Sequence, residues 1–164
     1  MRMPAHLCVT GVNQGPIKGG DGVSDIQGRE DSMLIQALDH NVAIPRDPQT
    51  GLPTGKRNHH PLKVTKFFDK ASPLLYMALC AGEQLSEVTL KFYRIAPNGM
   101  EEHYYSIKLI DAIIVDIRSW YPEALDPALE QFKHMEDVSF TYRQIQWTWE
   151  IDGIESEDDW QRPR

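Results

Sequence analysis

The segment from residue 61 to residue 95 constrains the fold more than any other part of the chain. It reads PLKVTKFFDKASPLLYMALCAGEQLSEVTLKFYRI. Alternating apolar and polar residues at both ends of the segment predict two strands. Between them we expect a short helix, capped by the Ser72 hydroxyl, with Pro73 in its first turn and a left-handed Gly82 at its end. A helix inserted between strands in a strand-rich chain leaves few folds to choose from.

Two details of this segment predict its surroundings. Lys66 interrupts the apolar face of the first strand, which favours a position near an edge or rim. Residues 74–81 are apolar on nearly every side, so we expect the helix to be covered from more than one direction. It would close one end of a barrel, or part of it would meet a neighbouring subunit.

The composition indicates a globular protein without a nucleic-acid or membrane role. A chain of 164 residues fits one domain, residues 1–164, and 41% of the residues are hydrophobic. The net charge of −7 argues against nucleic acid and anionic membranes as partners, and no apolar run is long enough for membrane insertion. The N-terminus lacks the apolar stretch of a cleaved signal peptide. Cys8 and Cys80 are expected to be buried free thiols of a protein made in a reducing cytoplasm.

The rest of the chain is predicted to be mainly β-structure. From Glu87 onward apolar residues alternate, with a turn at residues 97–99. Ile113, Val115 and Ile117 are expected to face inward. In the last long strand the apolar positions change from even to odd numbers, which indicates a bulge near residues 143 and 144. The strands expected outside the opening segment and the turn cover residues 4–10, 24–27, 31–42, 101–109, 112–120 and 136–151.

Taken together, these elements predict an antiparallel β-barrel of two sheets, or a tightly closed sandwich, with one short flanking α-helix. A helical turn is expected within residues 126–132. Residues 45–61 contain four prolines and two glycines without apolar periodicity, so we expect an extended, exposed loop. Residues 152–164 form an acidic, polar C-terminal tail that we expect to fray.

No motif in the chain carries a recognisable chemistry. The sequence GLPTGK at 51–56 lacks the spacing and the hydroxyl residue of a phosphate-binding loop. His59 and His60 are expected to be solvated loop residues. His103 or His134 with nearby carboxylates could suggest a hydrolase, but charged strand ends explain them as well. We therefore expect no enzyme, no catalytic residue, no cofactor and no metal site.

Several stretches together resemble the haemolysin-coregulated protein (Hcp) family, the tube-forming proteins of bacterial type VI secretion systems. They are DIQGRED (25–31), DHNVAIPRDPQTGLPTGKRNHHPL (39–62), FDKASPLLYMALCAGEQL (68–85), LKFYRI (90–95) and QIQWTWEIDG (144–153). The resemblance covers the chain from Met3 to about Trp160. Their order and spacing make it specific, although none of them is catalytic.

The resemblance implies a structural function. It predicts a homohexameric ring with a wide channel, and rings that stack into a tube expelled by contraction of a sheath. The partners that it implies are further copies of the chain, a spike protein, the contractile sheath, the baseplate and effector proteins carried in the lumen. The protein would be cytoplasmic before firing and then secreted without a cleaved signal peptide, into the medium or a target cell.

The resemblance and the apolar outward positions also suggest which residues make contacts. The loop at 45–61 resembles the family's loop that reaches an adjacent ring, and its partners could be Glu155, Asp158 and Asp159. Candidate ring-stacking residues are Arg46, Lys56, Arg57, His59 and His60. Candidate lateral-contact residues are Tyr104, Ile114, Leu75 and Tyr76.

Two other functions remain open at this point. One is a free ring-shaped effector carrier or chaperone. The other is a monomeric β-sandwich that binds a ligand such as a sugar, with Tyr142, Trp147 and Trp149 as a stacking platform, although aromatic residues at this spacing more often belong to a core.

Overall fold

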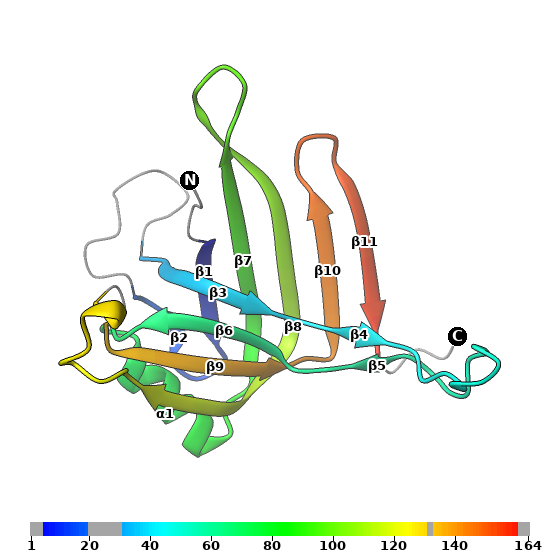
Figure 1. Ribbon diagram of the computed structural model, residues 1–164, viewed down its shortest axis with the longest axis horizontal. Helices are drawn as coiled ribbons and strands as arrows, with labels where there is room; N and C mark the ends of the chain where they lie inside the picture. Colours follow the sequence, from blue (N-terminus) through cyan, green and yellow to red (C-terminus); the bar gives the residue numbers. More distant parts are fainter. Residues whose placement is uncertain (1–4, 20–30, 131–132, 161–164) are drawn as a thin grey trace.

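The structure is a computed structural model that describes residues 5–19, 31–130 and 133–160 (Figure 1). It is mainly β, as predicted, with one α-helix among the described residues. The strands are β1 (Ala5–Gly11), β2 (Gly15–Ile17), β3 (Met33–Asp39), β4 (Val42–Ala43), β5 (Asn58–His59), β6 (Leu62–Phe67), β7 (Leu85–Ile95), β8 (Glu101–Trp120), β9 (Met135–Thr141), β10 (Gln144–Trp149) and β11 (Ile154–Asp159). The helix is α1 (Ser72–Ala81), and a 3-10 turn, η1 (Pro127–Leu129), lies where a helical turn was expected.

Six strands close into an antiparallel barrel, which confirms the predicted fold class. The order is β8-β7-β1-β3-β6-β9, and pairing of β9 with β8 completes the circle. Strands β10 and β11 extend the sheet beyond the barrel, on the right of the β7–β8 hairpin in Figure 1. The core consists of side chains pointing into the barrel, among them Leu7, Val64, Leu90, Leu109 and Phe140, all fully buried. An expected strand at residues 24–27 lies outside the described residues.

Strand β8 is one long strand of 20 residues where two strands were expected. It bends at Asp111, which has a positive φ of 53°. Before the bend β8 pairs with β10, and beyond it β8 pairs with β9, so that β9 and β10 follow one another along the same side of β8. The predicted irregularity near residue 143 is this break between β9 and β10, where the chain passes from the barrel to the extension of the sheet.

The helix α1 packs against the barrel, with Leu75 and Ala78 buried in the hydrophobic core. Gly82 ends it in the left-handed conformation (φ 65°), as predicted. Ser72 is the first helical residue and not the cap: its hydroxyl donates to Glu136 at 2.7 Å. One side of the helix stays open, because Met77 is 55% exposed and Cys80 is exposed as well. The expectation that Cys80 is buried is therefore wrong, and Cys8 is only partly buried.

The predicted edge position of Lys66 is also wrong. Strand β6 lies between β3 and β9, and the Lys66 side chain is fully buried. Its ammonium group donates to Glu136 at 2.5 Å, to Asp69 at 3.0 Å and to Ser72 at 3.3 Å. A buried ammonium is stable only when it is paired and hydrogen-bonded, and here it joins β6, β9 and the start of α1.

Residues 31–42 and the C-terminal segment also differ from expectation: the first contains a shorter strand, and the second contains a regular strand. The strand expected over residues 31–42 is shorter, since β3 ends at Asp39 and β4 is a separate two-residue strand. The C-terminal segment does not fray up to residue 159, because β11 pairs with β10 along its whole length. Among the described residues no helix is long and apolar enough to span a membrane.

Candidate assembly surface

Residues 42–59 form a hairpin that leaves the barrel, which we call the arm (Figure 1). Val42 pairs with His59 and Ala43 with Asn58, and an isolated bridge joins Arg46 to Pro53. Near the tip the Gly51 amide donates to the Asp47 carbonyl at 2.8 Å. The expected extended loop is thus an ordered hairpin whose side chains are mostly exposed.

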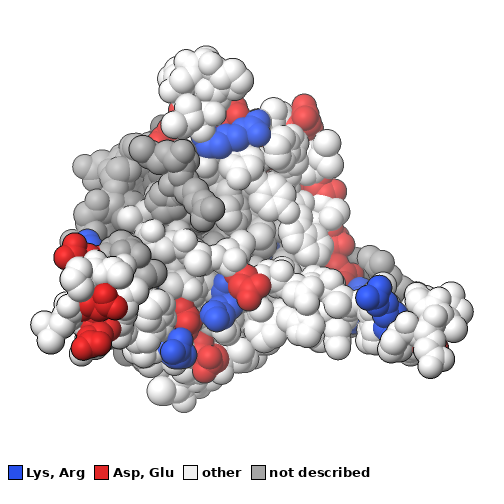
Figure 2. Space-filling model, viewed as in Figure 1, with Lys and Arg blue, Asp and Glu red and all other residues white. Residues whose placement is uncertain are grey.

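The exposed part of the arm is both apolar and basic. Ile44 is 53% exposed and Leu52 is 64% exposed. Arg46 and Lys56 are exposed beside them, and Figure 2 shows the Lys and Arg side chains on the arm at the right of the molecule. Apolar and cationic side chains together on a projecting hairpin are suited to contact with another protein surface.

A chain of hydrogen bonds holds the root of the arm against the end of the barrel. His40 Nε2 lies 2.8 Å from the Tyr142 hydroxyl, and His59 Nδ1 lies 2.7 Å from the same hydroxyl. His59 Nε2 lies 2.6 Å from Asp158 Oδ2. We call His40, Tyr142, His59 and Asp158 the arm latch, because they connect the arm with β11 and with the residues after β3 and β9.

Arg57 strengthens the latch from the arm side. Its Nε donates to Asp158, and its Nη2 donates to the Asp159 carbonyl at 2.8 Å. Burial alone would raise the pKa of Asp158, but the hydrogen bonds from Arg57 and His59 outweigh it and hold that pKa below its ordinary value. The carboxylate is therefore charged throughout the neutral range.

These contacts bear on three expectations about the arm. His59 is buried, with 6% exposure, and is not a solvated loop residue, whereas His60 is exposed. Asp158 and Asp159, expected as partners of a loop from another ring, bond Arg57 of their own chain. Of the five residues expected to stack rings, Arg46, Lys56 and His60 therefore remain exposed at the arm.

The residues expected to form lateral contacts have different positions. Ile114 is 3% exposed and Leu75 is fully buried, so neither can be a surface contact of the folded chain. Tyr104 is partly buried against Trp149, with ring centroids 5.8 Å apart, and the Tyr76 hydroxyl bonds the Ser119 hydroxyl. Both keep some exposure.

The residues beside Ile114 are the exposed ones. Ile113 is 42% exposed and Val115 is 46% exposed, although both were expected to face inward. Ile117, the third residue of the expected inward set, does pack against the core, because the register between β8 and β9 shifts between Ile114 and Asp116 and changes which positions face inward. Ile113 and Val115, which we call the β8 patch, are thus the apolar positions that β8 offers to a neighbour, and sequence periodicity alone could not find them.

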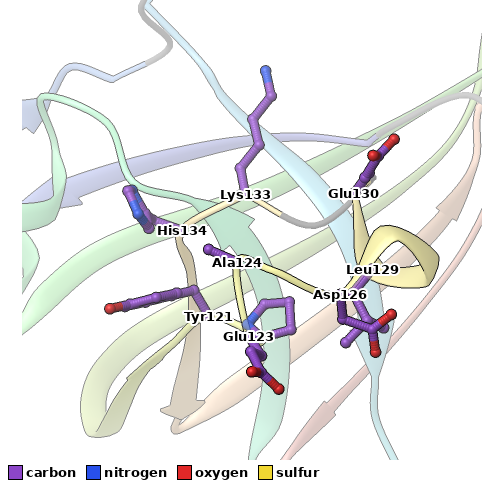
Figure 3. A pocket seen from close by; sticks show the side chains of 9 residues that line it. Tyr121, Glu123, Ala124, Asp126, Leu129, Glu130, Lys133 and His134 are labelled. Carbon is purple, nitrogen blue, oxygen red and sulfur yellow. The ribbon is translucent and has the colours of Figure 1, made fainter.

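A surface depression of about 500 Å³ lies beside the connection between β8 and β9. In Figure 3 Tyr121 and His134 lie on one side of it, with Asp126 and Glu130 on the other. The Tyr121 and His134 rings contact each other, with centroids 4.9 Å apart.

Within residues 5–19, 31–130 and 133–160 no group of three or more His, Cys, Asp or Glu side chains could hold a metal ion.

The histidines considered for catalysis are not arranged as a proton relay. Ser106 Oγ donates to Glu150 at 2.8 Å and lies 2.7 Å from His103 Nε2. Since the hydroxyl proton goes to the carboxylate, His103 Nε2 must donate to Ser106 and cannot accept its proton. The His134 ring lies on a different segment, tilted against Phe68 and edge-on to Tyr121.

The aromatic residues considered as a sugar platform are divided between two environments. Trp147 packs against the barrel core, and Tyr142 is buried in the arm latch. Trp149 contacts Tyr104 and lies under the Arg94 guanidinium. The three residues therefore do not form one exposed face.

Comparison with known proteins assigns the chain to a protein family. The family model described as "Type VI secretion system effector, Hcp" matches residues 9–149. This chain belongs to the Hcp family. The "Major exported protein" of Pseudomonas aeruginosa is 48% identical to it over 169 residues, which cover 99% of this chain and 98% of that protein.

Solved Hcp structures have the same fold over nearly the whole chain. One, described as "Crystal structure of Hcp protein", has a TM-score of 0.89 and 35% identity, covering 98% of this chain and 99% of that one. The "Secreted protein Hcp3 from Pseudomonas aeruginosa" has a TM-score of 0.76 and 41% identity, covering 97% and 99%. The fold and family expected from the sequence are thereby confirmed, and they connect this chain with type VI secretion.

Proposed function

We propose that this protein is the tube subunit of a type VI secretion system, which forms hexameric rings that stack and are expelled by sheath contraction. The observation that carries the proposal is an Hcp barrel matched over nearly its whole length, together with an ordered arm that projects from it. Such an arm has no role in closing the barrel, since β4 and β5 pair only with each other.

Two separate surfaces support two kinds of contact. The β8 patch, Ile113 and Val115, lies on the barrel wall and would make the lateral contact within a ring. Tyr104, in the first half of β8, and Tyr76, on α1, remain further candidates. The arm, with Arg46 and Lys56, and His60 directly after it would make the contact between rings. A head-to-tail contact joins two different patches and gives a ring when the rotation closes.

The remaining parts of the proposal concern cargo, partners and export. In this function the ring lumen carries effector proteins, and the tube meets the spike, the sheath and the baseplate. The chain starts in the cytoplasm and leaves the cell without losing an N-terminal signal. Mass spectrometry of the exported protein tests the last point: the N-terminal peptide should be intact, and a chain shortened by a cleaved segment would contradict it.

Native mass spectrometry and negative-stain microscopy of the purified protein test the assembly. We expect hexamers and annular particles. Replacing both Ile113 and Val115 by Asp should leave folded single chains, while replacing both Arg46 and Lys56 by Glu should leave rings that no longer stack. Lys108→Glu, a charge reversal on a partly exposed side chain of the first half of β8, is the control and should keep both contacts. Single polypeptides of the unmodified chain, even in concentrated samples, would overturn the proposal.

A further inference from the structure

The arm latch contains two imidazoles that share a single hydroxyl. Asp158 as a carboxylate can only accept hydrogen bonds, so His59 Nε2 carries a proton. The Tyr142 hydroxyl has one proton, which it can donate to one imidazole only. When it donates to His59 Nδ1, His40 Nε2 must donate to the Tyr142 oxygen, and every group in the chain is then satisfied.

One additional proton leaves this chain intact. If His59 is doubly protonated, its Nδ1 donates to Tyr142, and Tyr142 turns its own proton toward His40. A neutral His40 can take the tautomer with a bare Nε2 and accept it. The positive charge of His59 then lies against the Asp158 carboxylate at 2.6 Å, where it is stabilised.

A second additional proton breaks the chain. With both imidazoles charged, both donate to the Tyr142 oxygen, and the Tyr142 proton loses its acceptor in a site where the residue is 7% exposed. Two like charges would also flank one oxygen atom. The unsatisfied proton and the repulsion between the two charges weaken the contacts that join the root of the arm to Tyr142.

We propose that the arm latch positions the arm and that acid releases it: the latch holds with one charged imidazole and opens when both His40 and His59 are charged. The proposal rests on the proposed function only for its effect on stacked rings. Release of the arm root is a property of the single folded chain.

Several charged and aromatic groups surround the two imidazoles of the latch. Beside His59 lie Arg57 and Asp158, and the Trp160 ring covers it with centroids 5.0 Å apart. Asp159 is paired with Arg143 at 2.8 Å. Beside His40 lie Asp39 and His60. Burial lowers the pKa of His40, and His59 lowers it further against the opposing effect of Asp39.

Hydrogen exchange of the full chain, read by mass spectrometry and corrected for intrinsic rates, tests the release. Peptides covering residues 58–60 and 154–160 should be equally protected at about pH 7.5 and about pH 6.5 and should exchange at least about tenfold faster at about pH 4.5. The barrel strands β1 and β7 should stay protected at each pH.

Matched variants separate the latch from general acid sensitivity. His40→Gln keeps a group that can donate or accept but cannot be charged, so its arm root should stay protected at about pH 4.5. His134→Gln removes an exposed imidazole on the connection between β8 and β9, outside the latch and outside both proposed contact surfaces, and should show the same acid release as the unmodified chain. Equal protection at both ends of the pH range in the unmodified chain, or acid release that persists in His40→Gln, would overturn the proposal.

Assembly gives an independent readout. Rings should separate from stacks over the same pH interval, and His40→Gln should keep them stacked. A chain that shows acid release of the arm but never forms rings would remove the proposed function and leave the latch standing. Stacks that form without any acid release would remove the latch alone.

Discussion

Lys66 Nζ lies 2.5 Å from Glu136 Oε1, and the two fully buried side chains join the central strands β6 and β9. Asp69 and Ser72 complete the surroundings of the ammonium group, so the start of α1 is attached to the barrel by the same charge. A buried ion pair of this kind costs desolvation energy, and each member depends on the other.

Lys66→Met should destabilise the fold strongly, because it leaves the Glu136 carboxylate buried without its cation. We expect a loss of about 3–5 kcal/mol in the free energy of unfolding, measured by urea denaturation. Lys63→Met is the matched control on the same strand, since its side chain is 48% exposed and 4.0 Å from Asp137. The control should change stability by less than about 1 kcal/mol. Equal losses in the free energy of unfolding would show that the buried ion pair contributes no more to stability than the exposed one.

Ile114→Ala should lower stability, whereas Ile113→Ala should weaken ring formation, although the residues are adjacent. Ile114 is in the core, and removing its side chain should cost about 2–5 kcal/mol in urea denaturation. Ile113 is 42% exposed, so its replacement should change stability by about 0.5 kcal/mol or less while it weakens ring formation in native mass spectrometry. A stability loss at Ile113 that matched the one at Ile114 would contradict the orientation of β8.

Gly82→Ala should destabilise α1 through the backbone alone. Gly82 has a φ of 65°, and a Cβ there would meet no atom within 4 Å, so the cost is the left-handed conformation itself. We expect about 1–2 kcal/mol by thermal or urea unfolding. Gly55→Ala is the control, since Gly55 has ordinary backbone angles and the nearest atom to its Cβ would be Pro45 Cγ at 3.8 Å. A neutral Gly82→Ala would mean that the helix end can rearrange.

Asp158 should make stability depend on pH only in strong acid. Its pKa is held below the ordinary carboxyl value of about 3.9, so the folded state binds its proton less readily than the unfolded state. Its contribution is therefore complete above about pH 4 and is lost as the pH falls from there through the folded-state pKa. Asp158→Asn should reduce stability near neutral pH and flatten this acid decline in urea titrations. Glu155→Gln, an exposed change on the same strand, should leave the profile unaltered. An unchanged acid decline in Asp158→Asn would assign that decline to other carboxyls.

Local patterns in the sequence determined a large part of this protein. Apolar alternation gave the strands of a mainly β barrel, Gly82 gave the end of the helix, and the parity change near residue 143 marked the break between β9 and β10. Each of these depends on side-chain periodicity or on one residue's backbone preference, which are local properties. The order of the quoted stretches also indicated the Hcp family, which the comparisons confirm.

Only the tertiary structure decided which face of a strand is inside and which charges meet. Ile113 and Ile114 are the same residue type at adjacent positions. The pairing of β8 with β9 decides that the Ile114 side chain points into the core and the Ile113 side chain points outward. Lys66 and Glu136 are 70 residues apart, and His59 and Asp158 are 99 apart, so no local pattern could show that one pair is buried in the barrel and the other anchors the arm. Closure of the barrel brings these groups together, because a charged side chain can be buried only where the fold supplies its partner.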